Sequence, residues 1–118
     1  MHHGVKGTFE IKIKSNQKCL YQVIFESKNK KPVNLKFRNK ETGIEKTSLE
    51  ELGKELSGEI DKKEEKILTI NWYWNYENGE QGNKQDTKDA QTICNYQFDI
   101  KVIGKGEIEW KLKKEWKK

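Results

Sequence analysis

The chain has 118 residues, of which 32% are apolar and 36% are charged, so it has room for one domain with a thin core. Alternating strands build a thin core more readily than several helices, because every second residue of a strand is buried. The net charge is +5, but Arg38 is the single arginine and the lysines are interspersed with 19 acidic residues. This favours a solvated surface over a nucleic-acid interface.

The first part of the chain predicts three strands. Apolar and polar residues alternate over residues 9–13, 19–26 and 33–38, with turn-forming residues between these segments. In the second segment Leu20 and Ile24 add apolar residues to the otherwise polar face. A strand that is apolar on both faces is typical of the centre of a sheet.

One short helix is predicted over residues 48–57. Ser48 and Glu51 have the spacing of a capping box, and Gly58 is placed as a C-terminal stop. One helical face carries Leu49, Leu52 and Leu56. A helix of this length does not stand alone, so we expect it to cover an edge of the sandwich.

The second half of the chain predicts three more strands, over residues 68–76, 94–102 and 108–112. A long polar loop, residues 77–91, precedes the second of them, and glycines at 104 and 106 mark a turn before the third. The pattern therefore predicts an all-β chain: a jelly-roll-like or Ig-like antiparallel β-sandwich of about six to eight strands with one short helix.

The two cysteines occupy equivalent places in two predicted strands. Cys19 and Cys94 each stand on the apolar face, two residues before a tyrosine. If the two strands face one another, a disulfide would close a loop of about 75 residues and stabilise the fold by roughly 3–5 kcal/mol. The alternative is two separate buried thiols that act as small apolar side chains, and the sequence leaves both open.

Histidine occurs only at His2 and His3, in a leading segment that looks like a cloning remnant. This excludes a histidine-dependent nucleophile, general base or zinc site within the fold, so we predict no catalytic residues and no enzyme. The polar loop gathers side-chain oxygens of the kind that bind Ca²⁺, although without EF-hand spacing. The residues of this candidate cation-binding loop are Glu77, Asn78, Glu80, Asp86 and Asp89. No other cofactor is expected.

The aromatic residues divide between core and surface. Trp72 and Trp74 share one face of a predicted strand, where core packing is the expected role, and Tyr73 stands on the opposite face. Tyr73, Trp110 and Trp116 are the candidate interaction surface.

Three segments in order carry a resemblance to a known family. Trp72–Trp74, Asp86–Thr87 and Tyr96–Val102 resemble the W-x-W strand, the acidic Asp-Thr loop and the Y-x-F-x-I-x-V strand of the TasA/camelysin-like secreted proteins of Gram-positive bacteria, especially small clostridial members. The resemblance covers about residues 8–104 and implies an exported jelly-roll-like sandwich that assembles into matrix fibres or associates with the cell surface. Camelysin is classed as a metalloprotease, but the histidine ligands are missing here. The chain departs from the pattern after Gly104, where an extra strand follows.

We therefore expect a secreted, non-enzymatic protein of the cell surface or the biofilm-type extracellular matrix. Its partner would be itself or another envelope or matrix protein, with no membrane span, and the extra strand would fold back or complete a neighbour's sheet. The expected boundaries are a disordered lead-in at 1–7, the sandwich at 8–113 and a basic tail at 114–118. Two alternatives are a basic OB-like nucleic-acid-binding module that uses Tyr73 and lysines, and a glycan hydrolase with carboxylates in the polar loop.

Overall fold

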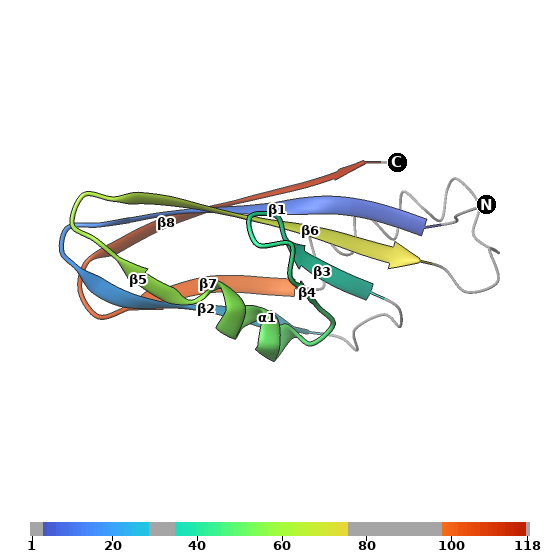
Figure 1. The fold of residues 1–118 in the computed structure, drawn as a ribbon, viewed down its shortest axis with the longest axis horizontal. Coiled ribbons are helices and arrows are strands. Elements are labelled where there is room, and N and C mark those ends of the chain that lie inside the picture. Colours follow the sequence, from blue (N-terminus) through green and yellow to red (C-terminus); the bar gives the residue numbers. More distant parts are fainter. Residues whose placement is uncertain (1–3, 29–34, 76–97, 118) are drawn as a thin grey trace.

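A computed structural model describes residues 4–28, 35–75 and 98–117 as two facing β-sheets with one short helix (Figure 1). The elements are β1 (Gly4–Ser15), β2 (Cys19–Ser27), β3 (Leu35–Asn39), β4 (Glu45–Lys46), α1 (Leu49–Leu56), β5 (Gly58–Ile60), β6 (Glu65–Asn75), β7 (Phe98–Gly104) and β8 (Ile108–Lys117). The five-stranded sheet has the order β4-β3-β6-β1-β8 and the three-stranded sheet has the order β5-β2-β7. Every described pair is antiparallel, so the predicted all-β sandwich is confirmed.

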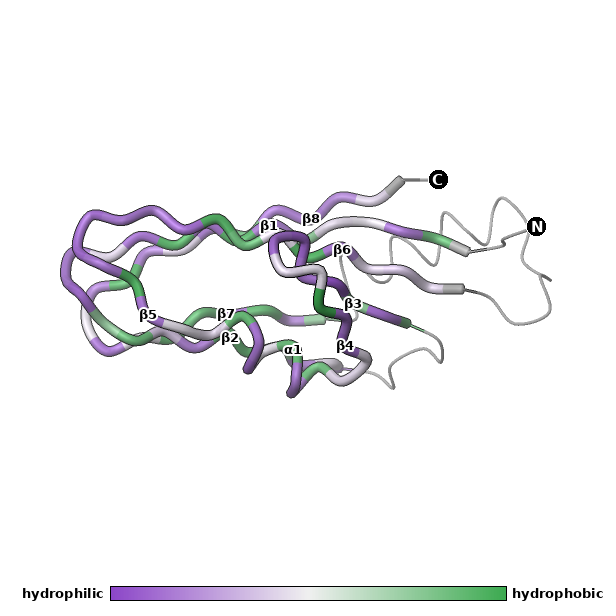
Figure 2. Tube along the Cα trace, in the orientation of Figure 1, coloured by the Kyte–Doolittle hydropathy of each residue, from purple (hydrophilic) through white to green (hydrophobic). Residues whose placement is uncertain are grey.

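The core lies between the two sheets and follows from the alternation of the strands. In β1, Phe9, Ile11 and Ile13 are fully buried, while Lys12 and Lys14, which alternate with the isoleucines, are exposed. The same alternation of apolar and polar residues is visible along the strands in Figure 2. Phe37 of the larger sheet meets Phe98 of the smaller one edge to face, with ring centroids 5.9 Å apart. Large aromatic rings thus fill the space between the two sheets in a chain that has few apolar residues.

The helix begins and ends where the sequence predicts. Ser48 is the N-cap, and its Oγ accepts a hydrogen bond from the Glu51 backbone N–H. The helix lies along β2 at the point where β5 ends: the Ser57 hydroxyl accepts from the Val23 N–H at 2.9 Å. At Gly53 an added Cβ would lie 2.6 Å from the Val23 carbonyl oxygen, so only glycine allows this close approach. The helix therefore covers an edge of the smaller sheet, as expected.

The structure extends beyond the predicted domain boundaries at both ends. The first strand begins at Gly4, where a disordered lead-in was expected, and the last strand ends at Lys117, where a basic tail was expected. The two ends support each other, since Gly7 lies opposite Trp116 in the β1–β8 pair. These boundaries were wrong because the extra backbone pairing depends on a partner strand about a hundred residues away.

Other boundaries shift by a few residues. No strand was predicted between the helix and residue 68, but β5 lies there and pairs with the start of β2. The two-residue strand β4 was not predicted either. The central position of β2 is confirmed, although Leu20 on its outer face is 63% exposed. The predicted strand at 33–38 is described from Leu35 and the one at 94–102 from Phe98.

Candidate functional site

The outward face of the five-stranded sheet carries charges of both signs. Across the β1–β8 pair, Glu10 lies opposite Lys113 and Lys14 lies opposite Glu109. On the other side of β1, Lys14 Nζ is 3.1 Å from a carboxylate oxygen of Glu65. Exposed ion pairs contribute little to stability. They do place charges of both signs along β1, although Lys12 lies opposite Lys111. This mixture differs from the one-sign surface that attracts a phosphate backbone.

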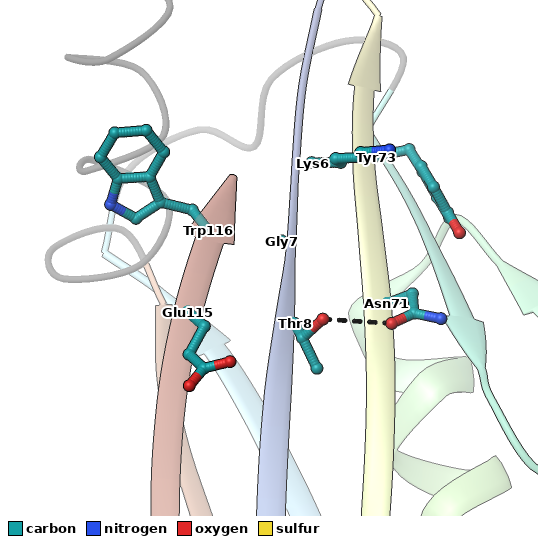
Figure 3. Close-up of a pocket in the computed structure, with 7 residues that line it drawn as sticks. All are labelled: Lys6, Gly7, Thr8, Asn71, Tyr73, Glu115 and Trp116. Atoms are coloured by element: carbon teal, nitrogen blue, oxygen red, sulfur yellow. Dashed lines mark hydrogen bonds between the residues drawn. The ribbon is translucent and has the colours of Figure 1, made fainter. Parts of the chain in front are cut away.

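A shallow hollow of about 240 Å³ lies on this face where β1 begins and β6 and β8 end (Figure 3). The Thr8 hydroxyl donates to Asn71 Oδ1 at 3.2 Å across it. The rings of Tyr73 and Trp116 point away from one another, so they do not form a common stacking platform. Among the described residues that line the hollow, Glu115 is the one carboxylate, whereas most glycoside hydrolases use two. The described lining thus contains neither a pair of stacked rings nor a pair of carboxylates.

The last strand, β8, lies at the end of its sheet. In the described part of the chain it pairs along one side only, with β1, and we call its other side the β8 edge. The strand is 10 residues long, whereas β4 at the opposite end of the sheet has 2. A long edge strand presents a row of backbone N–H and C=O groups to which another strand can pair. The β8 edge is the candidate functional site.

Side chains on the two faces of β8 differ in character. Trp110, Leu112 and Trp116 face inward and are partly buried against the core. The outward residues are exposed and charged: Glu109, Lys111, Lys113 and Glu115. Lysines on an edge strand ordinarily discourage pairing with another strand. Whether they do so here depends on which residue of an added strand would lie opposite each lysine.

Two lysines of β8 already have partners within the chain. Lys113 Nζ is 2.9 Å from Glu115 Oε1, and this hydrogen bond and the carboxylate charge raise the pKa of Lys113 above its ordinary value. Lys114 points inward, and its ammonium donates to the Phe98 carbonyl oxygen of β7 at 3.2 Å. The latter bond ties the edge strand of one sheet to the edge strand of the other.

The three predicted interaction residues occupy different faces of the same sheet. Tyr73 points outward into the hollow, while Trp110 and Trp116 lie on the inward face of β8 and remain partly exposed. The structure thus brings Tyr73 and Trp116 to one hollow and leaves Trp110 at the far end of β8. The residues that sequence analysis missed are Lys113 and Glu115, since the strand was expected to end at 112. Trp116 faces inward, as do Trp110 and Leu112, so it continues the apolar pattern at every second position. The charged Lys114 interrupts that pattern in the sequence.

Cys19 is a free thiol at the start of β2. Its Sγ is 3.3 Å from the Ser15 hydroxyl oxygen. Because that hydroxyl donates its own proton to the Gln17 carbonyl, the thiol is the donor in the Ser15–Cys19 contact. This arrangement is that of a cysteine used as a small, half-buried side chain.

Cys94 lies outside the described residues, so the predicted disulfide stays a prediction. The register of the smaller sheet argues against it. Phe98 lies opposite Ser27, at the far end of β2 from Cys19. At ~3.3 Å per residue, the distance along β2 from Cys19 to Ser27 is about 26 Å. The four residues from position 94 to Phe98 reach at most about 14 Å, and a disulfide needs Cα atoms within about 7 Å.

We expect both thiols to be free in the folded protein. Alkylation in denaturant without reductant, followed by mass spectrometry, should add two labels per chain. Reduction before alkylation is the control and should leave that number unchanged. A chain that takes up label only after reduction would contradict this expectation and restore the bridge.

The candidate cation-binding loop, with Glu77, Asn78, Glu80, Asp86 and Asp89, also lies outside the described residues. Within the described ranges, no group of three or more His, Cys, Asp or Glu side chains gathers as a metal site would require. The same ranges contain no helix with the length and apolar character needed to span a membrane. No family model, curated protein or solved structure matches the chain. The function is therefore argued from the geometry of β8.

Proposed function

We propose that this chain is a non-catalytic assembly domain of the cell surface or extracellular matrix, and that it acts by adding a strand at the β8 edge. The single observation that carries the proposal is the position of β8. It is a 10-residue strand that ends a five-stranded sheet and pairs on one side only among the described residues. Addition of a strand to such an edge is a recurrent mode of protein recognition, in which backbone hydrogen bonds supply affinity.

The extra strand folds back on its own sheet, which was one of the two outcomes expected for it. It pairs with β1 from Ser15↔Ile108 to Lys6↔Lys117, and Lys114 further fastens it to β7. Donation of β8 to a neighbour would break these contacts. Contact through the β8 edge keeps all of them, and this favours edge addition over strand exchange.

The extracellular location is a separate part of the proposal and rests on the resemblance to TasA/camelysin-like proteins. A free Cys19 gives it no additional support, because a disulfide was one of the features that suggested an oxidising compartment. Fractionation of the producing cells, with an antibody to this chain, tests the location. The chain is expected in the medium or the cell-surface fraction, and its recovery in the cytoplasm would contradict the proposed extracellular location.

Self-association is the expected result for the isolated protein. Because a single added strand buries little surface, the complex should be weak and should form only as the concentration rises. Sedimentation equilibrium from micromolar to millimolar protein measures it directly. A single species with the monomer mass over the whole range would contradict the proposal that the edge mediates self-association.

A further inference from the structure

We propose that the β8 edge pairs with β8 of a second copy of this chain, antiparallel, with a two-fold axis beside Lys113. This inference rests on the proposed function, since it names the partner and the register of the same edge. It is argued from the order of charges along the strand, which makes some registers repulsive and others attractive.

Symmetry limits the registers to a short set. A two-fold axis that relates two antiparallel edge strands of one continuous sheet runs normal to the sheet and keeps both inward faces on the same side. Outward residues then meet outward residues, and inward residues meet inward residues. The axis must therefore pass beside a residue, and within the middle of β8 that residue is Lys111, Leu112, Lys113 or Lys114.

Two of these positions place like charges in direct opposition. With the axis beside Leu112, Glu109 meets Glu115 and Lys111 meets Lys113, so each facing pair on the outer surface is repulsive. With the axis beside Lys114, Lys113 meets Glu115, but the paired segment shortens to 111–117. Lys114 then meets its own symmetry mate on the inward face, where its ammonium is bonded to the Phe98 carbonyl oxygen and not to a carboxylate. Like charges directly opposite one another destabilise a strand pair.

With the axis beside Lys113, the outer charges become complementary. Lys111 of each copy lies opposite Glu115 of the other. Lys113 meets its own symmetry mate, but Glu115 of the same chain lies 2.9 Å from its ammonium and offsets that repulsion. Lys111, an edge lysine that would repel many other strands, is therefore matched by Glu115 of another β8 in this register.

The inward face distinguishes the two registers that remain. With the axis beside Lys113, the paired segment runs over 109–117, and Trp110 of each copy lies opposite Trp116 of the other. Both indoles are partly buried against the core of their own chain, so each would gain an aromatic cross-strand neighbour. With the axis beside Lys111, the paired segment ends at 114 and leaves both copies of Trp116 outside it. The longer pairing with two aromatic pairs is the one that we infer.

Cysteine cross-linking tests the position of the axis. In a Cys19→Ser, Cys94→Ser background, Lys113→Cys and Lys111→Cys each place one thiol on the same exposed face of β8. Opposite residues have Cβ atoms about 5 Å apart, so only the residue beside the axis can form a disulfide with itself. Mild oxidation should convert Lys113→Cys to a covalent dimer much faster than Lys111→Cys. Faster dimer formation by Lys111→Cys, or equal rates, would overturn the inferred register.

Charge exchange tests the same register without cysteines. Lys111→Glu places two carboxylates opposite one another at two places in the dimer and should weaken association by about tenfold. The double variant Lys111→Glu, Glu115→Lys restores opposite charges and should recover most of the loss. Lys105→Glu changes net charge equally but lies in the turn before β8, so it should change association by less than about twofold.

The outcomes separate this inference from the proposed function. If the wild-type protein associates but Lys111→Glu acts no differently from Lys105→Glu, the register is wrong and the edge remains the candidate site. If the wild-type protein is monomeric at every concentration, both the second copy as partner and self-association at the edge are wrong. Circular dichroism of each variant establishes that the sandwich is intact before association is compared.

Discussion

Replacement of Trp72 by alanine is expected to lower the free energy of unfolding by about 3–5 kcal/mol. Trp72 is fully buried and is the largest of the fully buried side chains. Its ring packs against Phe9, with centroids 6.2 Å apart, and covers the backbone at Gly7. Alanine would leave a cavity between the sheets that strands fixed by hydrogen bonds on both sides cannot close. Chemical denaturation with a far-UV signal measures the change.

Two further variants show which property of Trp72 is responsible. Its indole Nε1 is buried and has no hydrogen-bond partner in the described part of the chain. Trp72→Phe removes that unpaired N–H together with part of the volume, so its cost should be well below that of alanine. Tyr73→Ala alters the next residue, on the outward face, and should cost less than about 1 kcal/mol. Equal losses of unfolding free energy from Trp72→Ala and Tyr73→Ala would show that Trp72 does not face the core while Tyr73 faces outward.

A side chain at position 7 should be the second most damaging change. Gly7→Ala is expected to lower the free energy of unfolding by about 1–3 kcal/mol, and Gly7→Val by more, because the site is already filled. An added Cβ would collide with the Trp72 ring and with the backbone oxygen of Glu115 on β8. Urea denaturation gives the loss in stability.

The matched control is Gly58→Ala, another glycine within a strand. There an added Cβ would lie 3.3 Å from the hydroxyl oxygen of Tyr21, and Tyr21 and Gly58 line the same surface hollow. A shift of a few tenths of an ångström into that hollow relieves the contact, so the cost should be below about 1 kcal/mol. Hydrogen exchange localises the effect of Gly7→Ala: the amides of β8 should exchange faster, while those of β2 should change little. Equal acceleration in both strands would contradict a local clash between β1, β6 and β8.

The periodicity of the sequence predicted most of the strands correctly for a simple physical reason. In Phe9–Ile13 and Leu35–Phe37 the apolar residues recur at every second position, and burial of one face of a strand requires this pattern wherever the partner lies. The helix was equally local, since Ser48 caps it and Leu52 and Leu56 mark its buried face. Such features depend on residues that lie close to one another in the sequence.

The candidate site depended on contacts that the sequence does not display. The predicted strand ended before Lys113, and Lys114 and Glu115 were assigned to a basic tail, because these three consecutive charged residues break the apolar period. They are held in a strand by backbone pairing to β1, and Lys114 is accommodated inward through its bond to Phe98. Backbone pairing is largely indifferent to side-chain type, so composition alone did not indicate it.

The sequence by itself determined that this protein is a sandwich of alternating strands, which strand faces are apolar, and where its helix begins. Only the tertiary structure decided which strands are neighbours. The order β4-β3-β6-β1-β8 makes the last strand an edge, and the register of β2 with β7 separates Cys19 from the region of Phe98. Alternation records that a face is buried, whereas strand order and register arise from pairing between segments far apart in the chain.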